Sequence, residues 1–195
     1  MDPQQLFAFI TFAFASTVSP GPNNIMLMTS GAHVGFKRTI PHMLGITFGF
    51  SFMVVLVGLG LMGVFHQYPI SQDILQVLCL GYLAYLAVKI AMSPPVNTGD
   101  SSYKPMSFLA AANFQWINPK AWSMAITAIG VYNVSGSWQG MAIISLGFAM
   151  VNLPSVSIWT VAGQKLQRVL SQPNVARLFN FTMAGLLLCS AALML

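Results

Sequence analysis

The chain alternates long apolar stretches with short polar connectors. Each of six apolar stretches is close to the roughly 20 residues that a helix needs to cross a bilayer. The connector at residues 93–106 is the longest and most polar, and it divides the chain into halves of about residues 1–95 and 105–195. We therefore expect a single transmembrane domain with three spans in each half. The predicted spans are Leu6–Ser30, Thr39–Val64, Ile70–Met92, Ser107–Tyr132, Gly140–Gly163 and Val175–Leu195.

Each half begins with a span that carries a helix break near its middle. In the first span, Pro20 and Pro22 flank Gly21. Each proline lacks an N–H and clashes with the carbonyl four residues earlier, so the helix is expected to end there. In the fourth span, Asn118 and Pro119 are favoured at an N-cap and at a first helical position, which predicts a new helix start. A proline kink satisfied by neighbouring helices is the simpler alternative at the first break.

The matching breaks predict how the two halves are related. Three spans in each half force the halves into opposite orientations across the membrane. Interrupted spans at corresponding positions in two halves indicate the midplane binding site of a transporter. We therefore expect an all-α membrane protein of six helices, arranged as a three-plus-three inverted repeat with broken first and fourth helices.

Composition and charge fit this assignment. Of the 195 residues 56% are hydrophobic and 6% are charged, whereas a soluble domain has about a quarter charged residues. Most Lys and Arg residues lie in or beside the first, third and fifth connectors, so the positive-inside rule places these connectors in the cytoplasm and both termini outside. The net charge of +5 then reflects topology and contact with anionic lipids rather than nucleic-acid binding. These cations are Lys37, Arg38, Lys89, Lys104, Lys165, Arg168 and Arg177.

Lys120 is the one charged side chain that we expect near the bilayer centre. A charge at that depth is costly and is by default functional. The three acidic residues of the sequence, Asp2, Asp73 and Asp100, all lie at or beyond span ends, so Lys120 has no buried counter-ion. An unpaired ammonium beside a helix N-terminus, which offers N–H donors, predicts an anionic ligand. The alternative is a lysine that pairs structurally or reaches the interface.

These features predict a zwitterionic amino acid as the ligand. Its carboxylate would meet Lys120 and the N–H groups near Asn23 and Asn24, and its ammonium would meet carbonyls freed by the prolines, at Ser16, Val18 and Gln115. Without an intramembrane acid to pair with a cationic side chain, small neutral substrates are favoured. Residues 113, 116 and 120 share one helical face at i, i+3, i+7 spacing, and residues 16, 19 and 23 repeat that spacing. The predicted site is Ser16, Ser19, Gly21, Asn23, Asn24, Asn113, Trp116, Asn118 and Lys120, with Pro20, Pro22 and Pro119 as the helix breaks.

Two motifs resemble the paired signatures of the lysine-exporter (LysE/RhtB) family of amino-acid exporters. They are Ser19-Pro20-Gly21-Pro22-Asn23 and Asn118-Pro119-Lys120, with further similarity at residues 35–38 and 81–86. The resemblance covers nearly the whole chain. It implies efflux of amino acids or their derivatives across the bacterial inner membrane, in exchange for protons. Cysteine/O-acetylserine and homoserine/threonine-like compounds are the candidate substrates, and the doubled Asn23-Asn24 resembles the cysteine/O-acetylserine branch.

A departure from the family pattern leaves the route of proton coupling open. Many family members carry Asp where this chain has Asn23, so a titratable group of the family is missing here. Lys120 and His42, which is expected near the cytoplasmic mouth, are the coupling candidates.

Two other function classes are disfavoured. A membrane thiol-redox protein needs cysteines beside the breaks, but Cys79 and Cys189 fall in the third and sixth spans. A metal-ion exporter or channel needs intramembrane carboxylates or His and Cys ligands, and the histidines His33, His42 and His66 lack metal-ligand spacing. The sequence thus predicts a transporter rather than an enzyme, without a cofactor or metal.

Two smaller features have two interpretations each. Gly45 and Gly49 form a small-xxx-small pair, which favours close packing within the bundle over a homodimer seam. Asn152 and Pro154 predict a kink in the fifth span that lines the transport path or eases packing.

Overall fold

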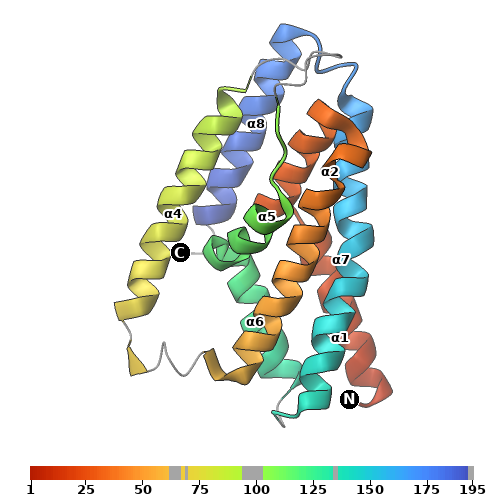
Figure 1. Cartoon of the computed structure of the whole chain (residues 1–195), viewed down its shortest axis with the longest axis vertical. Helices are drawn as coiled ribbons and strands as arrows, with labels where there is room; N and C mark the ends of the chain where they lie inside the picture. The colour runs from red at the N-terminus through yellow and green to blue at the C-terminus, as the bar shows by residue number, and fades with distance from the viewer. Residues whose placement is uncertain (62–66, 69, 94–102, 134–135, 193–195) are drawn as a thin grey trace.

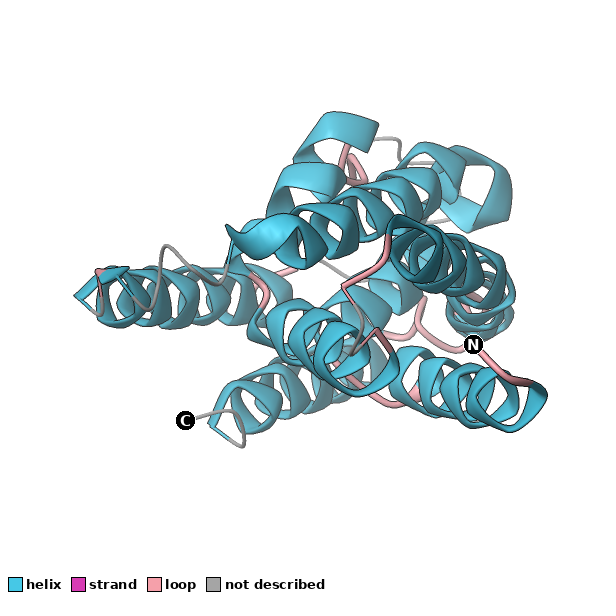
Figure 2. Ribbon diagram, turned by 90° about the horizontal axis from the view of Figure 1, so that it is seen from below, coloured by secondary structure: helices cyan, strands magenta, loops and turns pink. Residues whose placement is uncertain are grey.

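The computed structural model describes residues 1–61, 67–68, 70–93, 103–133 and 136–192, and in these residues all regular structure is helical (Figures 1 and 2). The ends of the second and sixth predicted spans lie outside the described residues. The elements are α1 (Pro3–Val18), α2 (Pro22–Leu56), a π-helical turn η1 (Val57–Leu61), α4 (Ile70–Ala91), α5 (Phe108–Phe114), a 3₁₀ turn η2 (Gln115–Ile117), α6 (Pro119–Tyr132), α7 (Trp138–Leu166) and α8 (Pro173–Ala192).

Helix α2 is not one rod, because the chain reverses within it at Gly35. This residue has φ 74° and ψ 178°, a left-handed backbone conformation that glycine adopts without steric cost. Ser30 Oγ lies 3.3 Å from His42 Nδ1, although 12 residues of continuous helix would span about 18 Å. Residues 22–34 therefore form a first arm and residues 36–56 a second arm that returns beside it. The reversal matches the predicted first connector.

Both predicted helix breaks are present. Helix α1 ends at Val18 and α2 begins at Pro22, with Gly21 in extended conformation between them. In the second half, α5 and η2 end at Ile117 and α6 begins at Pro119. Asn118 occupies the N-cap position of α6 in extended conformation, but its side chain makes no capping hydrogen bond. The second helix start was predicted correctly, with Asn118 at the N-cap and Pro119 in the first turn.

Helix α7 is the main support of the broken first helix. It packs along both arms of α2 and against α1, while α4 packs against α8 (Figure 1). The contact between α2 and α7 is close because glycines meet main chain: Gly31 faces Thr160, and Gly163 faces the carbonyl of Met28. A side chain at either glycine would separate the two helices.

The small-residue pair in the second arm packs inside the bundle, as predicted. Gly45 lies against the main chain of Phe108, and Gly49 lies against Ala112, so both glycines let α2 approach α5 closely. This contact gives the pair a role within one chain.

The outer surface of the bundle is apolar. Large exposed hydrophobic side chains occur on all seven α-helices of the described residues, and they include Phe7, Phe52, Val77, Met150 and Leu178. Within the described residues, two helical segments are long and apolar enough to cross a membrane, Pro22–Gly60 and Trp138–Leu166; the first of these contains the reversal at Gly35.

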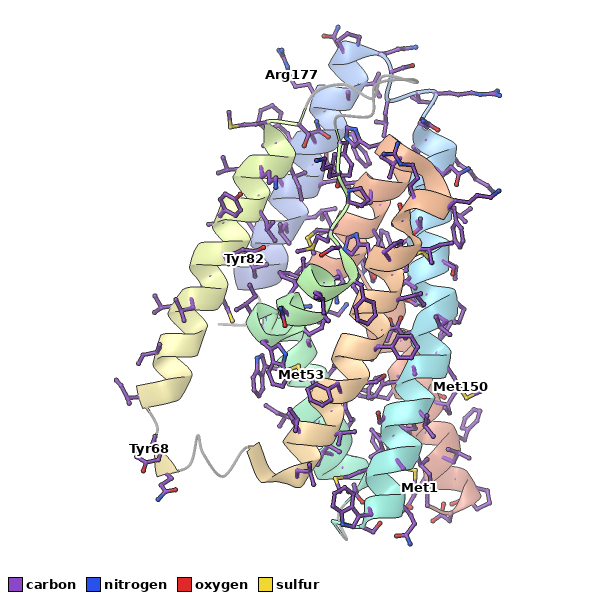
Figure 3. All side chains as sticks on the ribbon, viewed as in Figure 1. Met1, Met53, Tyr68, Tyr82, Met150 and Arg177 are labelled. Carbon is purple, nitrogen blue, oxygen red and sulfur yellow. The ribbon has the colours of Figure 1, made fainter. Side chains whose placement is uncertain are left out.

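Three of the connector cations lie at one end of the bundle. Lys89 and Lys165 are in the last turns of α4 and α7, and these helix ends lie at the same end of the molecule (Figure 1). Figure 3 shows Arg177 at that end, with Met1 and Tyr68 at the opposite end. This distribution is the one on which the predicted orientation rests.

Candidate functional site

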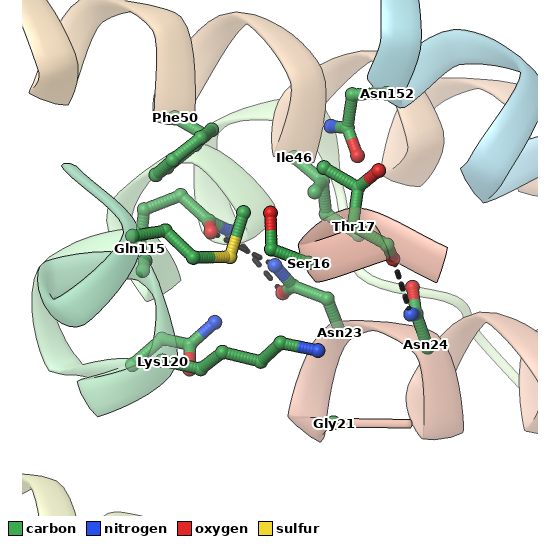
Figure 4. A pocket seen from close by; sticks show the side chains of 13 residues that line it. Ser16, Thr17, Gly21, Asn23, Asn24, Ile46, Phe50, Gln115, Lys120 and Asn152 are labelled. Atoms are coloured by element: carbon green, nitrogen blue, oxygen red, sulfur yellow. Dashed lines mark hydrogen bonds between the residues drawn. The ribbon is translucent and has the colours of Figure 1, made fainter. Parts of the chain in front are cut away.

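A polar pocket lies between the two helix breaks (Figure 4). It encloses about 370 Å³ of empty space, counted with the part that is open to solvent. The end of α1, both arms of α2, η2, α6 and α7 all contribute to it. The lining residues are Ser16, Thr17, Gly21, Asn23, Asn24, Ile46, Phe50, Gln115, Asn118, Lys120, Ala121, Met124 and Asn152.

Asn24, in the first turn of α2, donates hydrogen bonds to carbonyls at the end of α1 and so satisfies part of the first break. Its Nδ2 donates to the carbonyl oxygens of Thr17 at 2.7 Å and Ser19 at 2.8 Å. The Ser19 hydroxyl in turn donates to the carbonyl of Ser16 at 2.9 Å. Asn24 does line the pocket, as predicted, but its amide nitrogen is engaged with the main chain.

Helix α7 supplies two further donors to the same break. Ser155 Oγ donates to the carbonyl of Thr17 at 2.8 Å, and Trp159 Nε1 donates to that of Val18 at 3.0 Å. Unsatisfied carbonyls cost several kcal/mol each in hydrocarbon, so these side chains make the break tolerable there. The sequence offered no sign of this role beyond polar residues in an apolar helix.

The second break is held by bonds of its own residues. The Asn118 N–H donates to the carbonyl of Gln115 at 3.3 Å, and Trp122 Nε1 donates to that of Trp116 at 2.9 Å. All three carbonyls that the sequence predicted to be open to a ligand, that of Gln115 included, thus already accept a hydrogen bond from the protein. The prediction that they stand free is wrong, because neighbouring donors close both breaks.

Lys120 reaches from the second break to the first. Its Nζ donates to the carbonyl oxygen of Ser19 at 2.7 Å, to the Ser19 hydroxyl at 2.8 Å and to the carbonyl oxygen of Pro20 at 3.2 Å. The side chain passes over Gly21, where a Cβ would lie 2.7 Å from Lys120 Cδ. Ser19 and Gly21 are therefore brought to Lys120, as expected for one site.

Asn23 and Gln115 join the two breaks through their side-chain amides. Asn23 Nδ2 donates to Gln115 Oε1 at 2.9 Å, and Gln115 Nε2 donates back to Asn23 Oδ1 at 3.2 Å. The Gln115 side chain is fully buried, at 0% exposure, and also donates to the carbonyl of Ala111 at 2.9 Å. Sequence reasoning used only the Gln115 carbonyl and missed its side chain, although a polar side chain one turn before Pro119 in an apolar span was a signal.

The side-chain oxygen of Asn118 receives no hydrogen bond. Its residue exposure is 2%, and its buried Oδ1 has no hydrogen-bond partner. Because an unpaired buried acceptor costs about 1–3 kcal/mol, this oxygen, in a residue that lines the pocket, is suited to an N–H or O–H group of a ligand.

Three predicted residues do not line the pocket: Ser19, which nevertheless contacts Lys120, and Asn113 and Trp116. Asn113 is exposed, and the Trp116 ring packs edge-on against Trp122 at 5.9 Å and near Phe52 at 6.5 Å. The predicted shared face with Lys120 does not form, because η2 and the extended backbone of Asn118 interrupt the helical phase. Asn152, by contrast, lines the pocket and donates from Nδ2 to Thr47 Oγ1 at 3.2 Å.

His42 lies in a second polar cluster outside the pocket. It is 1% exposed, its Nδ1 lies 3.3 Å from Ser30 Oγ, and Ser30 Oγ lies 3.2 Å from the Tyr103 hydroxyl. The Tyr103 ring stacks on His33 at 4.4 Å. Burial raises the pKa of Tyr103 above its usual value, against the opposing effect of the Ser30 hydrogen bond, so this phenol stays neutral. His42 Nε2 is buried without a partner.

The described residues offer no group of three His, Cys, Asp or Glu side chains that could hold a metal ion. Cys79 is buried in α4 and Cys189 is exposed in α8, and neither lines the pocket. The chemistry of the pocket is therefore that of amides, hydroxyls, main-chain carbonyls and one ammonium.

Residues 14–195 match the family model described as LysE type translocator. Similar curated proteins include the cysteine/O-acetylserine efflux proteins of Escherichia coli strain K12 and Shigella sonnei strain Ss046. Each is 29% identical over 195 residues, which cover 98% of this chain and 97% of the relative. No solved structure gives a significant match.

Proposed function

This chain belongs to the LysE type translocator family, and we propose that it is a secondary transporter that exports small neutral amino acids or their derivatives from the cytoplasm. The observation that carries the proposal is the pocket between two broken helices, where one ammonium and no acid meet polar amides. The names of the similar proteins, cysteine/O-acetylserine efflux proteins, favour these two compounds as the first substrates to test.

The pocket offers different groups to different parts of an amino acid. The substrate carboxylate lies between Lys120 and the first turn of α2, where the N–H groups of Asn23 and Asn24 have no intrahelical acceptor. Asn118 Oδ1 accepts a hydrogen bond from the substrate. The small apolar part of the pocket, at Ile46 and Phe50, suits a short uncharged side chain.

The proposed architecture is six spans in a three-plus-three inverted repeat, in the bacterial inner membrane with both termini outside. Two equivalent contacts support it, in each of which a helix of one half packs against the broken span of the other half. Gly49 in α2 packs on Ala112 in α5, before the second break, and Gly147 in α7 packs on Phe9 in α1, before the first break.

Two serines, one in α2 and one in α7, each donate a hydrogen bond to the other's carbonyl. A two-fold relation between α2 and α7 would produce such a pair. Ser51 Oγ donates to the carbonyl of Ser145 at 3.2 Å, and Ser145 Oγ donates to that of Ser51 at 3.0 Å. The cations gathered at one end of the bundle support the cytoplasmic placement of that end.

Proton antiport is the proposed source of energy. Lys120 within the pocket and His42 in the Ser30–Tyr103 cluster are the titratable groups assigned to coupling. Lys120 is hydrogen-bonded to Ser19 at the end of α1, and His42 lies within hydrogen-bond distance of Ser30 on the other arm of α2, so a change in their protonation would alter contacts between these segments.

Counterflow into proteoliposomes tests the activity and its substrate class. Vesicles loaded with unlabelled cysteine, O-acetylserine, homoserine, threonine or lysine are diluted into labelled O-acetylserine, with and without an imposed pH gradient. We expect small neutral compounds to drive accumulation, lysine to drive little, and the gradient to increase the flux. Accumulation driven equally well by lysine, or by no amino acid, would contradict the proposal.

A further inference from the structure

The ammonium of Lys120 occupies a cage of three oxygens at the end of α1. The carbonyl of Ser19 (2.7 Å), the Ser19 hydroxyl (2.8 Å) and the carbonyl of Pro20 (3.2 Å) all lie within hydrogen-bond distance of Nζ. A lysine ammonium has three N–H donors and no acceptor. The number of acceptors therefore equals the number of protons, which makes this a complete site for a primary ammonium group.

The cage carries no formal negative charge. Its oxygens are two carbonyls and one hydroxyl, and the whole sequence contains only three Asp and Glu residues, none of which lines the pocket. The positive charge is instead stabilised by the dipoles of these groups and by the negative end of α1 beside them. A neutral cage holds a cation less firmly than a carboxylate would, so its occupant can be exchanged.

Gly21 leaves room for the Lys120 side chain. With a Cβ at this position, the new atom would lie 2.7 Å from Lys120 Cδ and 3.0 Å from Nζ, so the Lys120 side chain would have to shift. The backbone of Gly21 is extended, with φ 179°, a conformation that any residue adopts. Glycine at position 21 is therefore explained by the space that Lys120 needs, and not by the backbone conformation.

We infer that this cage is a binding site for primary ammonium groups, which Lys120 fills when the transporter is empty and the α-ammonium of the substrate fills when it is loaded. The inference rests on the proposed function. An amino acid brings both charges that the exchange needs: its carboxylate attracts the Lys120 ammonium away from Ser19, and its own ammonium replaces that group on the same oxygens. In the absence of substrate Lys120 thus supplies a donor to the carbonyl of Pro20 and a second donor to that of Ser19, which also accepts from Asn24.

Thermal unfolding of the purified full chain in detergent tests the cage without any amino acid. Lys120→Ala empties the cage, and Gly21→Ala displaces Lys120 without removing it. Each variant is heated in methylammonium chloride, tetramethylammonium chloride or sodium chloride at equal ionic strength. Tetramethylammonium has the charge without N–H donors, so it separates hydrogen bonding from general salt effects. Wild type and Lys165→Ala, which removes an exposed lysine, are the controls.

We expect methylammonium, at about ten times its Kd or more, to raise the unfolding midpoint of both variants by at least about 2 °C over the other two salts. Wild type and Lys165→Ala should show no difference between salts, because Lys120 fills the cage in both. The inference is overturned if neither variant responds to methylammonium, if sodium stabilises them equally, or if wild type responds as they do. Since no amino acid is present, a failure of the proposed transport activity would leave this result unchanged.

Discussion

The side-chain amides of Asn23 and Gln115 form a two-way hydrogen-bonded pair, 2.9 Å in one direction and 3.2 Å in the other, across 92 residues of sequence. The pair links the first turn of α2 to η2, and so links the two helix breaks directly. Both residues line the pocket. A movement that separates the two helix breaks around a substrate must therefore break these hydrogen bonds, unless Asn23 and Gln115 move together.

The pair should contribute measurably to stability. Asn23→Ala leaves the buried Gln115 amide without its partner, which we expect to lower the free energy of unfolding by about 1–3 kcal/mol. Gln115→Ala should cost a similar amount. The double variant should be more stable than the sum of the single changes predicts, by about 0.5–3 kcal/mol, as for residues in direct contact. Denaturant unfolding in detergent measures these values, and strict additivity would argue that the pair is energetically silent.

Asn24 should be required for the fold of the first break. Asn24→Leu removes one side-chain donor from each of two carbonyls, those of Thr17 and Ser19, and should lower the free energy of unfolding by about 2 kcal/mol or more. Asn174→Leu is the matched control, because Asn174 is exposed in α8. Equal stability of the two variants would show that the amide of Asn24 is dispensable.

The contact between α2 and α7 should depend on Gly163. Alanine there would press its methyl group onto the carbonyl of Met28, and such overpacking costs about 1–3 kcal/mol. Gly185→Ala is the control, since a Cβ at Gly185 meets no atom within 4 Å; this change should be neutral or stabilising by up to about 1 kcal/mol because alanine favours a helix. The unfolding midpoints of the two variants should move in different directions, and a loss of stability in both would contradict the packing described.

Asn23 should be reachable from water and covered by substrate. In a background without Cys79 and Cys189, Asn23→Cys should react with a small polar thiol reagent, and saturating substrate should slow the reaction several-fold. Asn174→Cys, outside the pocket, should react at one rate throughout. Equal labelling of position 23 with and without substrate would place the binding site elsewhere.

The effects of proline on its own helix were enough to predict the two helix breaks. They were not enough to predict which side chains donate hydrogen bonds to the carbonyls at those breaks. Pro20, Pro22 and Pro119 act on their own helices through a missing N–H and a steric clash, so both interruptions could be predicted from the sequence. The donors to the first break include Ser155 and Trp159, which are brought there by the packing of α7, more than 130 residues away in the chain. No spacing rule connects such distant positions.

The phase of the fourth span was mispredicted for a related reason. An i, i+3, i+7 pattern places Asn113 and Lys120 on one face only if the helix is continuous. The 3₁₀ turn η2 and the extended Asn118 rotate α6 relative to α5, so Asn113 is exposed while Lys120 points to the first break. The same break that identified the site thus invalidated the helical spacing used to complete it.

Efflux of labelled O-acetylserine from proteoliposomes that contain wild type or Lys120→Met tests the central claim most directly. Methionine keeps an unbranched side chain of similar length but removes the charge that the substrate carboxylate needs. We predict rapid efflux with wild type and with Lys165→Met, and efflux at the rate of protein-free vesicles with Lys120→Met, which should reconstitute in equal amount. Efflux through Lys120→Met at the wild-type rate would contradict the account.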